Sequence, residues 1–179
     1  MFRRLALVVL AWCCAIGSLG AQAAGVASGK GTIDSGGQPV AFAPRFAWAC
    51  AEGKGAKRST WIVLTEKEPP AEKWAAAKDR PEARRRWCEK EKASFVAVKL
   101  DAAWKVDLYF LCPANGAVNT EMLSTWNGLD SVVLTFDNGD PRRLKGTLRT
   151  GAGSCPGPDG TPAYCTPTGD YAFEAPLVP

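Results

Sequence analysis

Apolar and polar side chains alternate along much of the chain, and a period of two residues is typical of a β-strand with one buried face. Pro44 falls inside the longest alternating stretch and indicates a bulge or an edge position, because proline cannot donate a ladder hydrogen bond. Residues 60–65 are apolar on both faces and predict a central strand. The longest stretch covers residues 40–50, and one of its faces carries the larger side chains: Val40, Phe42, Phe46, Trp48 and Cys50.

Further stretches of strand character are separated by turn signals, which are clearest at residues 35–38 and 137–140. Seven or eight short strands in this chain predict an all-β fold, and we expect an immunoglobulin-like antiparallel β-sandwich. Trp48, Trp61 and Trp104 lie on apolar strand faces and are expected in its core. The additional strands are expected at residues 31–34, 95–100, 104–112, 132–136, 142–149 and 171–175.

One segment interrupts the strand pattern. Residues 66–92 are rich in alanine and charge, with nine basic and seven acidic residues. Asp79 and Glu82 have the spacing of a helix capping box, and Pro81 then falls near the start of a helix. We therefore expect a helical insertion, at about residues 70–92, that joins two strands and covers one end of the sandwich.

The amino terminus has the three parts of a secretory signal peptide. Arg3 and Arg4 form a basic head, residues 5–16 are uncharged and apolar, and residues 21–23 have the small-x-small form of a cleavage site. A run of twelve apolar residues is too short to span a hydrocarbon core of about 30 Å. We therefore expect residues 1–23 to be removed. Residues 24–179 would then form a single domain, in the periplasm or secreted, with no membrane association.

Composition and charge exclude several classes of function. The 179 residues include no histidine, so a Ser-His-Asp triad, a Cys-His pair and a histidine-bearing zinc site are impossible within this chain. Loss of Arg3 and Arg4 with the signal leaves 20 basic against 18 acidic residues. That balance argues against nucleic acid as a partner. The sequence indicates no cofactor.

Five cysteines remain after cleavage, and the odd number leaves at least one thiol without a partner in the chain. Cys155 and Cys165 are expected to pair with each other, because residues 156–160, which lie between them, must turn back on themselves.

Strand direction addresses the other three cysteines. If the strands at 40–50, 60–65, 95–100 and 104–112 are consecutive and antiparallel, Cys88 and Cys112 lie at the same end of the sheet. Cys50 then lies a full strand away, at about 17–20 Å. Because a disulfide needs α-carbons within about 7 Å, we expect a Cys88–Cys112 bridge and a free Cys50 on an apolar face.

Several strand and turn segments carry a resemblance. The strand at residues 31–34 is followed by Gly37-x-x-Val40-x-Phe42, a later strand ends in residues 63–67 (VLTEK), and the chain closes with Tyr171-x-Phe173-x-Ala175-Pro176. These segments resemble a loose group of small secreted proteobacterial β-sandwich proteins of unknown function, which share a G-x-I/L-x-x-x-G-x-x-V start and a V-L-T-D/E-K strand end. The resemblance covers most of the mature chain and implies the β-sandwich. It implies no site residue.

Candidate binding residues lie outside the strands, on the insertion and in the connection between residues 113 and 130. Indole rings and arginines are enriched at binding hot spots. Core packing is the alternative for the tryptophans, because an amphipathic helix must bury one face. Glu82, Glu89 and Glu91 are also placed to neutralise the arginines along a helix. The candidate binding surface consists of Trp74, Trp87, Trp126, Arg84, Arg85 and Arg86.

These observations favour a non-catalytic binding protein whose partner is another protein of the cell envelope, with an inhibitor or immunity-type role as one form. Two alternatives stay open. The tryptophans could form a carbohydrate-binding module. A hydrolase built on two carboxylates would also need no histidine.

Overall fold

The structure, a computed structural model, describes residues 24–35, 38–112, 122–124, 132–137, 142–151, 153–156, 162–165 and 167–178. The expected signal peptide lies outside these ranges. No helix within them is long and apolar enough to cross a membrane.

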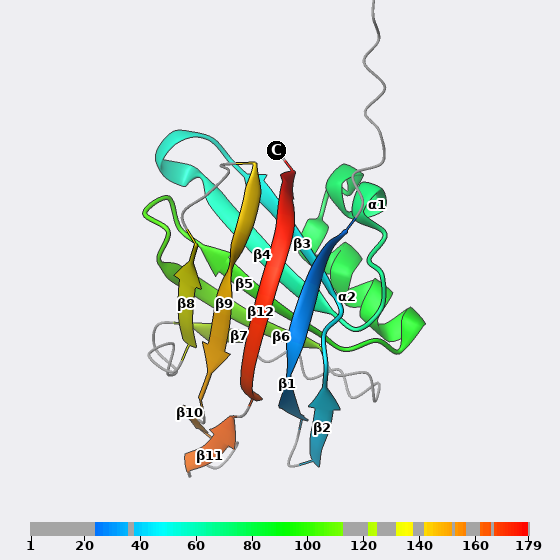
Figure 1. Cartoon of the computed structure of the whole chain (residues 1–179), viewed down its shortest axis with the longest axis vertical. Helices are drawn as coiled ribbons and strands as arrows, with labels where there is room; N and C mark the ends of the chain where they lie inside the picture. The colour runs from blue at the N-terminus through cyan, green and yellow to red at the C-terminus, as the bar shows by residue number, and fades with distance from the viewer. Residues whose placement is uncertain are drawn as a thin grey trace, which may run out of the picture.

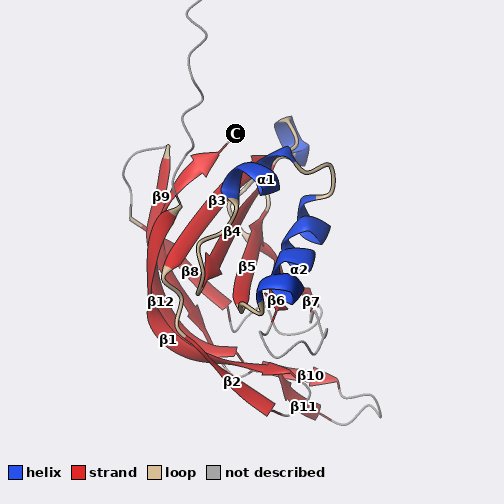
Figure 2. Cartoon of the chain, turned by 90° about the vertical axis from the view of Figure 1, so that its right-hand side faces the viewer, coloured by secondary structure: helices blue, strands red, loops and turns tan. Residues whose placement is uncertain are grey.

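Ten strands form one almost entirely antiparallel sheet, which curves until it nearly closes on itself (Figures 1 and 2). The strand order is β7-β6-β5-β4-β3-β1-β12-β9-β8, with β2 paired to β1. A separate hairpin is formed by β10 (Gly153–Pro156) and β11 (Pro162–Cys165). The ten strands are β1 (Gly25–Ser35), β2 (Gln38–Phe42), β3 (Phe46–Glu52), β4 (Ser59–Thr65), β5 (Phe95–Leu100), β6 (Val106–Cys112), β7 (Met122–Ser124), β8 (Val132–Phe136), β9 (Arg143–Thr150) and β12 (Pro167–Val178).

The all-β class and the helical insertion are confirmed, but an immunoglobulin-like sandwich is not shown. The strands that we expected in two facing sheets are joined edge to edge, because β1 pairs with both β12 and β3. The end of β12 also pairs with β3, where Leu177 lies opposite Ala49. The continuous strand expected at residues 40–50 is divided into β2 and β3 around Pro44.

The inner face of the curved sheet carries the main hydrophobic core. Residues of β3–β6 meet residues of β1, β9 and β12 across this interior, among them Ile62, Leu64, Leu148 and Tyr171. Trp104, in the turn between β5 and β6, lies edge to face against Phe136 of β8, with ring centroids 5.5 Å apart. The expectation that Trp104 belongs to a strand core is wrong: it has a φ of 63° in the turn and is 46% exposed.

Two helices cover the outer face of the β3–β6 half of the sheet (Figure 2). They are α1 (Ala71–Ala76) and α2 (Arg80–Glu91), and they connect β4 to β5. Alternate residues of β3 explain this second layer, because Ala47 and Ala49 point into the interior while Trp48 and Cys50 point toward the helices. A strand that is apolar on both faces needs cover on both, and the insertion provides it.

Candidate functional site

The candidate site is built on α2, whose start the sequence determines locally. Asp79 precedes the helix with extended backbone angles, and its carboxylate accepts a hydrogen bond of 3.0 Å from the backbone N–H of Glu82. Pro81 occupies the first turn, where its missing N–H has no helical partner to lose. The helix ends at Glu91, and Lys92 caps it in the left-handed conformation. The Asp79 contact confirms one half of the expected capping box, whereas the carboxylate of Glu82 binds Arg85 and Arg86.

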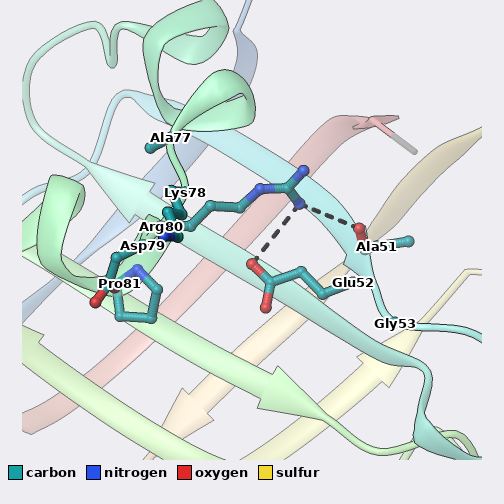
Figure 3. A pocket seen from close by; sticks show the side chains of 8 residues that line it. All are labelled: Ala51, Glu52, Gly53, Ala77, Lys78, Asp79, Arg80 and Pro81. Atoms are coloured by element: carbon teal, nitrogen blue, oxygen red, sulfur yellow. Dashed lines mark hydrogen bonds and ion pairs between the residues drawn. The ribbon is translucent and has the colours of Figure 1, made fainter.

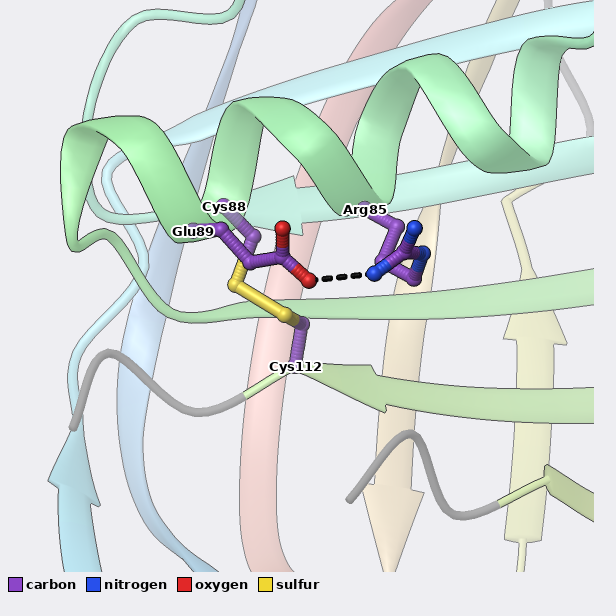
Figure 4. The surroundings of a disulfide bond; sticks show 4 residues. All are labelled: Arg85, Cys88, Glu89 and Cys112. Carbon is purple, nitrogen blue, oxygen red and sulfur yellow. Dashed lines mark hydrogen bonds and ion pairs between the residues drawn. A yellow bond between two sulfur atoms is a disulfide. The ribbon is translucent and has the colours of Figure 1, made fainter. Parts of the chain in front are cut away.

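A disulfide fixes the carboxyl-terminal half of α2 to the sheet. Cys88 bonds Cys112 at the end of β6, with an S–S distance of 2.09 Å and α-carbons 6.5 Å apart (Figure 4). This bridge confirms the expected pairing. Lys67 adds a second attachment nearby by donating a hydrogen bond from Nζ to the backbone oxygen of Glu91. The position of α2 on the sheet is therefore set by covalent and polar contacts as well as by packing.

Three tryptophans form a chain of edge-to-face contacts from the sheet to the surface. The ring of Trp74 lies 5.5 Å from that of Trp48 and 5.2 Å from that of Trp87, with interplanar angles of 77° and 89°. Trp74 is 1% exposed, so it is a core residue and does not offer a free ring to a partner. Trp87 is half-buried and packs edge to face against Trp74.

The three consecutive arginines have three different environments. Arg84 is 1% exposed and points into the helix–sheet interface, where its guanidinium carbon lies 4.5 Å from the ring centroid of Trp61. Burial lowers the pKa of Arg84. The expectation that Arg84 lies on the binding surface is therefore wrong. Its side chain instead packs against the indole rings of Trp48 and Trp61 on the outer face of the sheet.

Arg85 is half-exposed but neutralised within α2. It donates two hydrogen bonds of 2.7 Å to Glu82 and pairs with Glu89 on the next turn (Figure 4). The hydrogen bonds from Arg85 and Arg86 lower the pKa of Glu82 to about 2. Glu82 therefore remains ionised and cannot serve as a general acid.

Arg86 is the exposed member of the run, with 74% of its side chain accessible. Its Nε donates a 2.8 Å hydrogen bond to Glu82. In the described part of the chain, its two terminal nitrogens have no partner. A planar pair of donors thus remains available to an acceptor from outside.

A groove of about 590 Å³ runs between α1, α2 and the segment before α1, and we call it the helix groove. Three of the six candidate residues selected from the sequence line it: Trp74, Arg86 and Trp87. Its lysines were missed because they are scattered along the sequence and form no motif. The groove carries four cations and two carboxylates: Lys67, Lys73, Arg86, Lys90, Glu68 and Glu91.

A second groove, of about 760 Å³, lies at the other end of α2, where β3 ends (Figure 3). Two of its ionic groups, Arg80 and Glu52, are engaged with each other. Arg80 donates to the backbone oxygen of Ala51 at 3.3 Å and lies 3.7 Å from the carboxylate of Glu52. Glu52 also accepts a 2.9 Å hydrogen bond from the indole of Trp61. This arrangement fastens the start of α2 to β3, and we assign it a structural role.

Cys50 lies fully buried beneath α2 and is free, as expected. Burial raises its pKa to about 11, despite the opposing influence of Arg84. A thiol in this state is a poor nucleophile. Within the described ranges, no group of three or more Cys, Asp and Glu side chains is placed to hold a metal ion.

Three of the selected residues lie, wholly or in their side chains, outside the described part of the structure. Trp126 lies outside the described residues. Cys155 and Cys165 belong to the paired strands β10 and β11, where Cys155 lies opposite Ala163 and Cys165 opposite Gly153. The chain does turn back between them, but their side chains lie outside the described part, so the Cys155–Cys165 bridge stays a prediction.

Comparison of the chain with protein-family models, with curated proteins and with solved structures finds no match. The site must therefore be interpreted from its own geometry.

Proposed function

We propose that this chain is a non-catalytic protein of the periplasm or the cell exterior that binds a protein partner through the helix groove. The observation that carries this proposal is the placement of Trp87. Its ring is half-buried, it packs edge to face against a core residue, and it lines the helix groove together with four cations, Arg86 among them. Tryptophan and arginine are the residues most enriched at the energetic centres of protein interfaces.

The rigidity of this surface supports the same proposal. Trp74 fixes the angle of Trp87, and the Cys88–Cys112 bridge fixes the helix that carries it. A surface that is ordered before binding loses less conformational entropy when the partner arrives. The disulfide is also consistent with an oxidising location outside the cytoplasm.

The two alternatives have less support from the described residues. A sugar platform needs exposed aromatic rings in a row, whereas Trp74 is buried and Trp104, in the β5–β6 turn, packs against Phe136 of β8. A carboxylate hydrolase needs one carboxyl group that holds a proton. In the second groove, Glu52 is paired with Arg80 and Asp79 caps α2.

Site-specific crosslinking tests the proposal. A photo-crosslinking amino acid at Lys73 points into the helix groove, whereas the same group at Lys105 lies on the exposed β5–β6 turn and serves as the control. We expect the Lys73 derivative to capture one defined envelope protein in the producing cell. The purified partner should then bind the mature chain directly, and Trp87→Ala should weaken that binding at least about tenfold. Equal capture from both positions, or direct binding that Trp87→Ala leaves unchanged, would contradict the proposal.

A further inference from the structure

The helix groove is lined by more positive than negative side chains, and this excess indicates the charge of its partner. Four cations line the groove against the carboxylates of Glu68 and Glu91. Lys73 and Lys90 are exposed, and neither forms an ion pair within the described residues. An excess of unpaired cations beside an aromatic ring attracts an anionic partner and repels a cationic one.

Arg86 adds geometry to this charge. Its Nε donates to Glu82, whereas its two terminal nitrogens have no partner among the described residues and its side chain is exposed. Two parallel N–H groups match the two oxygens of one carboxylate. Arg85 shows the contrast, because Glu82 and Glu89 occupy its donors. Of the three arginines, Arg86 alone combines exposure with a pair of donors that no described residue occupies.

Trp87 lies one position further along α2 and contributes to the same groove. Lys90 follows Arg86 by four residues and therefore lies one turn away on the same side of the helix. Lys73 faces them from α1. An occupant thus meets an aromatic ring, a guanidinium with free donors and two lysines in the same groove.

We propose that the segment bound in the helix groove carries an aspartate or glutamate next to an apolar side chain. The carboxylate binds the terminal nitrogens of Arg86, and the apolar side chain packs on Trp87. This inference rests on the proposed function, since it names the chemistry of the protein segment that the groove receives.

Three short synthetic peptides test it. They share a Leu-Trp pair and differ only in the flanking residues, which are glutamate, glutamine or lysine. Binding to the mature chain is followed through the indole N–H signal of Trp87 in two-dimensional NMR, assigned with a Trp87→Phe variant. We expect the glutamate peptide to bind about tenfold more tightly than the glutamine peptide, a difference that shrinks as salt is added. The lysine peptide should bind most weakly.

Variants of Arg86 separate charge from geometry. Arg86→Gln should weaken binding of the glutamate peptide about tenfold, as the loss of a charge-assisted pair requires. Arg86→Lys keeps the charge but not the pair of parallel donors, so it should restore binding only in part. Lys105→Gln, on the exposed β5–β6 turn, makes the same change in net charge and should have no effect.

Each contrary result has a separate meaning. Equal affinity for the glutamate and glutamine peptides, or an Arg86→Gln variant that binds normally, overturns the acidic segment while protein binding stands. Failure of all three peptides to shift the Trp87 signal counts against the proposed function as well. A neutral oligosaccharide that shifts this signal when the peptides do not would assign the groove to carbohydrate and overturn both.

Discussion

The guanidinium carbon of Arg84 lies 4.5 Å from the ring centroid of Trp61 and 6.0 Å from that of Trp48, inside the interface between α2 and the sheet. Neither terminal nitrogen of Arg84 has a hydrogen-bond partner there among the described residues. A buried charge without hydrogen bonds carries a desolvation penalty, and cation–π contacts of roughly 1–2 kcal/mol offset only part of it. The side chain of Arg84 stabilises the interface mainly by filling it.

Replacement of Arg84 by methionine should therefore keep or raise the stability of the protein. Methionine retains an unbranched apolar stem between the two indoles and removes the unpartnered charge. Arg84→Ala should instead lower the stability, because it leaves a cavity between Trp48 and Trp61. Urea denaturation followed by tryptophan fluorescence measures both. A methionine variant that is less stable than the alanine variant would show that the guanidinium itself holds the interface together.

The disulfide should supply a large part of the stability of the insertion. Cys88 and Cys112 are 24 residues apart in sequence. Closing a loop of that size lowers the conformational entropy of the unfolded chain and so raises its free energy by about 3 kcal/mol. The double variant Cys88→Ser, Cys112→Ser should lose about that amount in urea denaturation. Cys50→Ala is the matched control, because it removes a cysteine without breaking a bridge, and it should lose less. A double variant as stable as the wild type would mean that packing alone positions α2.

The position of this bridge could be predicted from the sequence, and the reason is local. The strands β3 to β6 follow one another along the chain and lie side by side in the same order, so strand direction fixes which cysteines share an end of the sheet. Cys112 lies opposite Phe95 at one end, whereas Cys50 lies opposite Trp61 toward the other. The cap at Asp79 could be predicted for the same reason, because it needs only four neighbouring residues.

The continuous curved sheet could not be predicted from local patterns. It depends on the pairing of β1 with β12, in which Val26 lies opposite Glu174, and no turn or spacing signal connects segments so distant in sequence. The burial of Arg84 was missed for a related reason. A run of three arginines is typical of a solvated helix face, and only the arrangement of Trp48 and Trp61 beneath the helix reveals the space that one of them fills.

Gly169 should be intolerant of any side chain. A Cβ at this position would lie 2.0 Å from the hydroxyl oxygen of Tyr171, whose ring packs over the backbone of β12, and the same ring lies against Gly31 on β1. We expect Gly169→Ala to destabilise the protein by about 1–3 kcal/mol in thermal or urea denaturation, as overpacking of a close-packed interior does. Gly31→Ala should destabilise the protein by a similar amount, because a Cβ there would lie 1.9 Å from the same hydroxyl oxygen.

A tyrosine variant provides the control for these glycines. The hydroxyl of Tyr171 is buried and has no hydrogen-bond partner among the described residues, so Tyr171→Phe removes a polar group without breaking a hydrogen bond. Its stability should lie close to that of the wild type or above it. If Tyr171→Phe were as damaging as Gly169→Ala, the hydroxyl would be bonded in solution and the crowding at Gly169 would not explain the result.

The buried thiol of Cys50 should make the protein less stable at high pH. Burial raises the pKa of Cys50 from its ordinary value of 9.0 to about 11 in the folded state. Between these two values the unfolded chain releases a proton that the folded chain keeps, so the free energy of unfolding falls as the pH rises through this window. Below the unfolded pKa both states hold the proton, and the contribution is fully present. Urea denaturation at about pH 8 and about pH 10.5 should therefore show a larger loss of stability for the wild type than for Cys50→Ala, which keeps every other titratable group.

A thiol-specific reagent provides a second test of the buried thiol. It should leave the folded protein unmodified at the lower pH and react once urea exposes Cys50. Equal losses in the two proteins, or rapid modification of the folded chain, would show that Cys50 is not held as a buried, protonated thiol.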